Sequence, residues 1–381
     1  MRTRAHHISK AVWLFSLAML WSGVAWAQVS DTLRFRLHTD TSLVTQFYQQ
    51  RAFEPAWTHE GGPTTQAYGL SEVLSSSFED GLNPEEYQAH QIISYLQSFD
   101  RPGPFSPSIR ADLELLLTKA FFTWASDMDQ GMVDPASISL IWGTHDHDPD
   151  LVERLILGLE AGRIEAVMKL LRPRFEGYLR LKEALASYRQ LAEEGGWPLV
   201  QEGKKLEPGM QDSRVKALRA RLRITDPVPE PHPDSLEVYD SSLAGAVRAF
   251  QKRHGLAEDG IVGRAVLAAL KVSVEERVEQ IRLNLERWRW LPDTLGRNHI
   301  RVNVPGYALE VIEGRERVLS MRVIVGSRSN KTPLFSSQVE KVVLAPRWYV
   351  PRSIIEGEIL PKQIADSTYL VVTEKGHKPL F

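Results

Sequence analysis

The sequence contains no cysteine among its 381 residues. Disulfide bonds, thiolate zinc sites, iron–sulfur clusters and a cysteine nucleophile are therefore excluded for this chain. An excess of one charge is also missing: 46 Lys and Arg side chains nearly balance 48 Asp and Glu side chains. This balance argues against a predominantly basic nucleic-acid-binding protein. The 43% apolar fraction and the length instead predict a globular chain of roughly two or three domains.

Long apolar runs are absent as well, except near the N-terminus. Residues 1–27 have the organisation of a signal peptide: a basic start, an apolar stretch over residues 11–21, and Ala25 and Ala27 at the positions that signal peptidase reads. The apolar stretch is shorter than the about 20 residues of a membrane-spanning helix. We therefore expect export to the periplasm. The alternative is an uncleaved segment that tethers the protein to the membrane.

The first domain is expected to be helical and to cover residues 39–195. Leu113, Leu117, Phe121 and Trp124 recur at helical spacing, and similar stripes precede and follow them. Pro149 after Asp148 is typical of the first position of a helix, which we expect to run to Leu159.

A second, smaller domain is expected over residues 207–270. Three short amphipathic helices are indicated by stripes that comprise Val215, Leu218 and Leu222; Leu243, Val247 and Phe250; and Val266, Leu267 and Leu270. The proline-rich residues 226–233 form a loop between the first two. Three helices around one core are about the minimum that folds in roughly 60 residues.

A charged linker helix is expected within residues 273–298, and the pattern then changes from helical to alternating. Strands are predicted over residues 299–304, 308–312, 318–325 and 339–344. Residues 299–381 therefore form a β-rich part, and the fold class is multidomain α+β. The β-rich part looks incomplete, because the sequence ends soon after these strands.

The most specific local pattern lies between residues 249 and 270. Gly255 stands where a helix ends and a positive φ is needed, and Asp259-Gly260 forms a tight turn into the next helix. This pattern resembles the peptidoglycan-binding domain of many wall enzymes. It departs from that family at Arg264 and Val266, where Pro-x-Thr is usual. The resemblance gives five candidate peptidoglycan-binding residues, Phe250, Gln251, Asp259, Gly260 and Gly263, although each of them also suits a purely structural role in the turn and core.

The flanking segments resemble the large periplasmic L,D-transpeptidases. Upstream, the matching residues are Phe47, Tyr48, Arg51, Phe53, Pro55, Ala56, Trp57, Asp80 to Pro84, Tyr87, Glu114 to Thr118, Gly131 and Val133 to Pro135. Downstream, they lie in residues 284–292, 303–305, 321–326, 332–335 and 346–354. Each segment alone is compatible with caps, turns and core aromatics. Their order along the chain makes the resemblance specific.

The resemblance implies acyl transfer on peptidoglycan. In that family a cysteine thiolate attacks the carbonyl between the third stem residue, a diamino acid, and the terminal D-alanine, which leaves. An amine of a neighbouring stem then resolves the thioester and forms a 3–3 cross-link. A histidine activates the thiol, and backbone N–H groups hold the oxyanion.

The family's His-Gly turn and Ser-x-Gly-Cys-x-Arg segment do not occur in this sequence, in which His254-Gly255 belongs to the peptidoglycan-binding pattern. We therefore assign no catalytic residue and expect no activity from the chain as printed. Two hypotheses follow: a C-terminally truncated transpeptidase, or a complete, non-catalytic protein that binds peptidoglycan or acts as a scaffold. Peptidoglycan is the expected partner, no nucleic acid is expected, and the partners in wall synthesis are unknown.

Other chemistries are less well supported. His145 to Asp148 alternate imidazole and carboxylate groups but lack a third distant ligand, so no metal or cofactor is expected. Ser213-x-x-Lys216 matches the nucleophile pattern of penicillin-binding proteins without its partner motifs. Trp288 and Trp290 lie among arginines diluted by Glu279 and Glu286, and are interpreted as packing at a domain junction.

Overall fold

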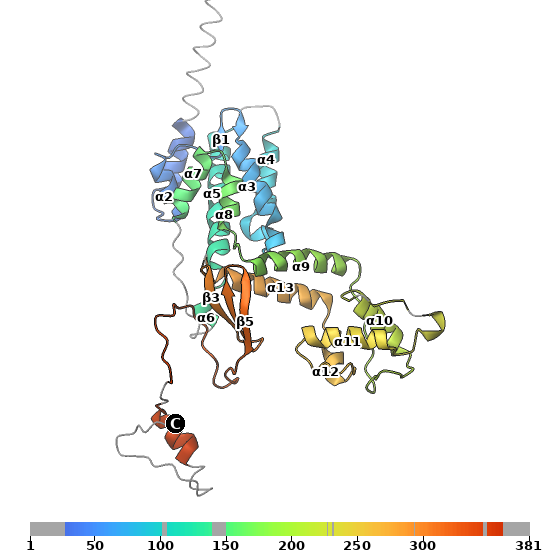
Figure 1. Cartoon of the computed structure of the whole chain (residues 1–381). Coiled ribbons are helices and arrows are strands. Elements are labelled where there is room, and N and C mark those ends of the chain that lie inside the picture. Colours follow the sequence, from blue (N-terminus) through green and yellow to red (C-terminus); the bar gives the residue numbers. More distant parts are fainter. Residues whose placement is uncertain are drawn as a thin grey trace, which may run out of the picture. The chain divides into compact units, whose positions relative to one another are not determined.

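The computed structural model describes residues 27–100, 105–138, 150–226, 228–230, 232–292, 294–345 and 349–360 (Figure 1). The predicted signal peptide up to residue 26 and the His145–Asp148 segment lie outside the described residues. Two compact units are distinguished, Met1–Leu334 and Phe335–Phe381, and each is treated by itself. In the described part, no helix combines the length and the apolar character needed to cross a membrane.

The first domain is built from helices around α5 (Pro107–Gln130). A helix over residues 27–37 precedes it. The other elements are α2 (Leu43–Gln50), β1 (Thr58–His59), β2 (Gly62–Pro63), α3 (Thr65–Ser75), η1 (Ser76–Asp80), η2 (Pro84–Tyr87), α4 (Ala89–Ser98), α6 (Pro135–Ile138), α7 (Leu151–Glu160), α8 (Ile164–Leu171) and α9 (Glu176–Glu193). Helices α2, α3, α4, α7 and α8 surround α5 (Figure 1).

Local sequence signals explain why α5 forms and becomes buried. The Ser106 side chain accepts a hydrogen bond from the Ile109 N–H at the N-terminus, and Pro107 fits the first helical turn. Gly131, with φ of 85°, ends the helix. Between these ends, Leu113, Leu117, Phe121 and Trp124 are buried, as the helical spacing predicted.

Helix α7 begins at Leu151, two residues after the expected start at Pro149. Asp150, rather than Asp148, is the capping residue, and its carboxylate accepts a hydrogen bond from the Glu153 N–H at 2.8 Å. Two aspartates flank Pro149, and a pattern of this kind does not decide which one caps the helix.

The second domain contains α10 (Arg214–Arg223), η3 (Pro233–Ser235), α11 (Ser241–Arg253) and α12 (Arg264–Lys271). Their apolar stripes meet in one core that includes Leu218, Val247, Phe250 and Leu270, so the predicted three-helix arrangement is confirmed. Helix α11 is capped by Asp240, which accepts a hydrogen bond from the Leu243 N–H at 2.8 Å.

Helix α13 (Val274–Arg289) lies along α9 (Figure 1). Ser273 and Glu276 form a capping box at its start, which fixes the point where the chain turns out of the second domain. Tyr178, Leu185, Ile281 and Leu285 form a separate small core between the two helices. Trp288 packs on Phe175 with ring centroids 5.2 Å apart, as expected for a junction aromatic.

Three antiparallel strands follow, in the order β3 (Asn298–Asn303), β4 (Ala308–Glu313) and β5 (Glu316–Arg322). A β-bulge interrupts the pairing at Val311 and Ile312. These strands confirm three of the four predicted strands, with ends shifted by up to three residues.

The predicted strand over residues 339–344 is wrong. Within the described stretch 294–345, residues 336–343 have no regular structure, and Val339, Val342 and Leu344 are exposed. Alternating residues form a strand only where a neighbouring strand satisfies their backbone groups. The second unit instead contains the short turns α14 (Arg352–Ile354) and η4 (Ile355–Ile359).

Candidate functional site

The turn that follows α11 is held by the side chain of Gln251. Its amide nitrogen donates to the Asp259 Oδ1 atom at 2.7 Å and to the Ile261 carbonyl at 3.1 Å, and its oxygen accepts from the Gly260 N–H at 2.9 Å. The residue is only 2% exposed. Both N–H donors and the oxygen of this buried amide are therefore used to tie the turn to the helix.

Two glycines make this turn geometrically accessible. Gly255 has φ of 65° just after α11, and Gly260 has φ of 73° at the tight turn. Both values lie in the left-handed region, which glycine adopts without a steric penalty. The Tyr239 hydroxyl donates to the Gly260 carbonyl at 2.6 Å and fixes the turn from the opposite side.

The five predicted binding residues therefore fall into two groups. Phe250, Gln251 and Gly260 are buried, and Gly263 is a partly buried residue at the start of α12. Asp259 is exposed, although hydrogen bonds from Ile261 N–H and Gln251 already lower the pKa of its carboxyl. The first group shapes the module. Direct contact of the five residues with a ligand stays a prediction, and Asp259 is the most accessible of the five.

A cavity of about 350 Å³, here called the α9–α13 groove, opens beside this module. It is lined by Leu181, Ala184 and Tyr188 of α9, by Arg253 and His254 at the end of α11, and by Arg277, Gln280, Ile281 and Asn284 of α13. Sequence reasoning missed this groove, because its walls come from segments about 100 residues apart that no local pattern connects.

The groove combines apolar side chains with polar and basic ones. Burial and the nearby cations Arg277 and Arg253 lower the pKa of His254, which keeps its ring neutral near pH 7. Its Nδ1–H donates to the Phe250 carbonyl at 2.8 Å, so Nε2 remains an acceptor. Such a surface suits a ligand with amide or hydroxyl donors and carboxylates.

Another buried basic group supports the junction. Arg221 is 3% exposed and stacks on Trp197, with 3.8 Å between the guanidinium carbon and the ring centroid. Burial lowers the pKa of Arg221 to about 10. Trp197 in turn donates to the Val272 carbonyl at 3.2 Å, which ties the segment after α9 to the start of α13.

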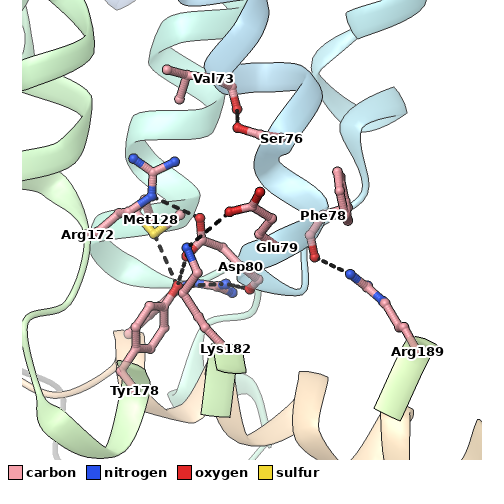
Figure 2. A network of polar contacts seen from close by, with 11 residues as sticks. Val73, Ser76, Phe78, Glu79, Asp80, Met128, Arg172, Tyr178, Lys182 and Arg189 are labelled. Atoms are coloured by element: carbon pink, nitrogen blue, oxygen red, sulfur yellow. Dashed lines mark hydrogen bonds and ion pairs between the residues drawn. The ribbon is translucent and has the colours of Figure 1, made fainter. Parts of the chain in front are cut away.

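Asp80, the last residue of η1, connects this turn to α9 (Figure 2) and to α13. Its carboxylate is fully buried and lies 2.9 Å from Arg172 Nε, 2.8 Å from Lys182 Nζ and 3.0 Å from the Tyr178 hydroxyl. The Arg289 guanidinium donates to the Asp80 carbonyl. Burial alone would raise the pKa of Asp80, but Arg172 and Lys182 outweigh it and hold the pKa below its ordinary value.

Glu114 organises the upstream motif residues in the same way. Its carboxylate is fully buried. The donors to it are the Tyr48 hydroxyl (2.8 Å), the N–H groups of Ala56 (2.8 Å), Trp57 (3.0 Å) and Thr58 (2.7 Å), and the Thr58 hydroxyl (2.7 Å). Burial raises the pKa of Glu114, and these donors oppose the shift. Motif residues separated by more than 50 positions thus meet around one carboxylate.

Among the described residues, no group of three His, Asp or Glu side chains is placed to hold a metal ion. The candidate sites described above are the module over residues 211–270 and the α9–α13 groove beside it.

Comparison with known families divides the chain into three matches. Residues 42–185 match a "Scaffold domain", residues 211–270 a "Putative peptidoglycan binding domain", and residues 297–377 an "L,D-transpeptidase catalytic domain". The three matches follow the order that the sequence motifs indicated.

Two curated proteins are similar over shorter stretches. A "Putative L,D-transpeptidase" of Haemophilus influenzae is 36% identical over 112 residues, which cover 29% of this chain and 22% of that protein. The N-acetylmuramoyl-L-alanine amidase CwlM of Mycobacterium tuberculosis is 37% identical over 81 residues, or 19% of this chain and 20% of that protein. The matched region thus spans about a fifth of the length of either relative.

Proposed function

We propose, from the premise that the chain belongs to the L,D-transpeptidase family, that it works in the periplasm on peptidoglycan and takes part in forming 3–3 cross-links between stem peptides. In this proposal the module over residues 211–270 holds the chain on the wall. The scaffold and α13 then keep that module at a fixed position beside the α9–α13 groove.

The observation that carries the proposal is the intact architecture of the module. Gln251 closes the turn at Gly260, and the core around Phe250 is complete. The adjoining groove adds His254, Gln280 and Asn284 as groups able to bond to stem peptide or sugar.

Acyl transfer requires groups other than those that bind peptidoglycan. The thioester route needs a thiolate, and these 381 residues contain no cysteine. We therefore propose that the residues present here contribute recognition and positioning. A non-catalytic peptidoglycan-binding or scaffolding protein is the second candidate function, and the match over residues 211–270 supports it.

One assay separates catalysis from binding. The full chain is incubated with a tetrapeptide stem, and free D-alanine is measured. We expect none above the buffer control, because no residue of this chain can form the thioester. Release of D-alanine that scales with protein concentration would contradict this expectation.

Binding is tested by co-sedimentation of the full chain with purified insoluble peptidoglycan. We expect the chain in the pellet, and about thirtyfold weaker binding for the double variant Gln280→Ala/Asn284→Ala, since each of the two lost hydrogen bonds is worth about 1 kcal/mol. Gln190→Ala, an exposed position on α9 outside the groove, is the matched control. Recovery of the unsubstituted chain in the supernatant would refute wall binding.

A further inference from the structure

A second cavity lies beside the Asp80 network, which contributes Arg172 and Arg289 to its wall. Its volume is about 290 Å³. It is lined by Met128 and Asp129 of α5, Arg154 of α7, Leu170 and Leu171 of α8, the following residues Arg172 to Phe175, Arg289 of α13, and Leu291 and Thr294. We call it the arginine cavity, because four of these side chains are arginines.

Two of the four arginines are already engaged by the protein. Arg172 uses Nε for Asp80 and stacks on Trp124 at 5.1 Å. Arg289 donates through its two terminal nitrogens to Glu286 and to the Asp80 carbonyl. These contacts hold both guanidinium groups rigidly at the cavity wall, as Figure 2 shows for Arg172 beside Met128 and Asp80.

The polar capacity of these arginines is not exhausted. Arg289 is 2% exposed, and its Nε atom is buried with no hydrogen-bond partner among the described residues. Leaving a donor of a buried cation unsatisfied is unfavourable, so such a group points to a missing acceptor. Arg154 and Arg174 form no ion pair within the described part of the chain.

Charge and shape together define the ligand. Asp129 is the acidic residue among the described lining side chains, so positive charge is in clear excess. Guanidinium groups bind carboxylates and phosphates with two parallel hydrogen bonds. The remaining wall is apolar, formed by Leu170, Leu171, Phe175 and Leu291, and therefore favours an anion that carries a small apolar group.

We propose that the arginine cavity binds the C-terminal carboxylate of a peptide whose last residue is small and apolar. The terminal alanine of a peptidoglycan stem has this chemistry, and its choice as the ligand rests on the proposed function. The carboxylate lies between Arg154, Arg174 and the buried Nε of Arg289, and the methyl group faces the apolar wall. Because Arg289 belongs to α13, a bound stem fastens that helix to the scaffold.

The test is calorimetric titration of the full chain with a stem tetrapeptide and with the same peptide as its C-terminal amide. We expect the free acid to bind and the amide to bind at least about tenfold more weakly, because charge-assisted hydrogen bonds are about twice as strong as neutral ones. Inorganic phosphate is titrated in parallel. Phosphate binding without peptide binding would overturn the proposal in favour of a simple anion site.

Variants locate the binding to this cavity. Arg154→Ala and Arg174→Ala each remove a cation that has no ion-pair partner in the described structure, so both are expected to fold, and each should weaken the free acid by about tenfold. Arg163→Ala is the matched control, because this exposed arginine precedes α8 at the end far from the cavity. Equal affinities of acid and amide, or equal losses in Arg174→Ala and Arg163→Ala, would refute the assignment.

This experiment is independent of the wall-binding assay. The Gln280→Ala/Asn284→Ala variant should keep its affinity for the free tetrapeptide, and Arg174→Ala should still sediment with peptidoglycan. If both variants lost both the affinity for the tetrapeptide and the sedimentation with peptidoglycan, the proposal of two separate sites would be contradicted.

Discussion

The helical scaffold and the three-stranded sheet of this chain differ in where their charged and apolar side chains lie. The scaffold buries the carboxylates of Glu114 and Asp80 completely. The sheet leaves Ile300 54% and Leu319 47% exposed, and its carboxylate Glu310 forms ion pairs at the surface. The scaffold thus encloses carboxylates within its apolar core, whereas the sheet leaves apolar side chains exposed.

This contrast shows where single side chains control stability. A buried carboxylate surrounded by donors is indispensable, since removing it leaves every donor without an acceptor. A sheet held by the backbone pairing of β3, β4 and β5 depends little on any one exposed side chain. Substitutions at matched carboxylates should therefore have very different effects in the two regions.

The largest effect is expected for Glu114→Ala. Five hydrogen bonds from backbone and side-chain donors lose their acceptor, and we expect the scaffold to lose about 4 kcal/mol of unfolding free energy. Hydrogen exchange of the α5 amides, followed by mass spectrometry, measures this loss. Glu54→Ala, at an exposed position of the same domain, is the control and should leave α5 exchange unchanged.

A smaller but pH-dependent effect is expected for Asp80→Asn. The amide retains the size of the side chain but loses its attraction to Arg172 and Lys182, at a cost of about 2 to 3 kcal/mol at neutral pH. The same hydrogen-exchange measurement, applied to α9 and α13, should show faster exchange. Unchanged α9 exchange would contradict the proposed role of Asp80 at this junction.

The sign of the pH dependence follows from the lowered pKa of Asp80 in the folded protein. Its stabilising contribution is complete above the ordinary value of 3.8 and is lost as the pH falls through the lower folded value. The stability difference between the unsubstituted chain and Asp80→Asn should thus shrink below about pH 4. Asp31→Asn, at an exposed position whose partner Arg34 lies 3.7 Å away, is the control variant.

Sequence periodicity was sufficient for the elements whose stability is local. The stripe through Val215, Leu218 and Leu222 predicted α10, and glycine at position 255 predicted the end of α11. In both cases the determining residues lie within a few positions of one another. The alternating pattern at 339–344 misled, because a strand also requires a partner that its own residues do not specify.

The sites were harder to predict, because they too depend on partners from distant parts of the sequence. The motif containing Asp80 was visible in the sequence, but its partners Arg172, Lys182 and Arg289 are spread over more than 100 positions. Both the α9–α13 groove and the arginine cavity are formed where distant helices meet. The candidate binding residues taken from the local motif were largely turn and core residues, since local motifs report local structure.

The smallest effect is expected for Glu310→Ala in the sheet. Hydrogen bonds from Arg301 and Arg317 lower the pKa of Glu310, yet both arginines are about half exposed, and water screens their attraction. We expect a loss of about 0.5 kcal/mol or less, measured as the change in hydrogen exchange of the β4 amides. A loss as large as that of Glu114→Ala would show that the sheet, like the scaffold, depends on a single carboxylate, and would remove the contrast between the two regions.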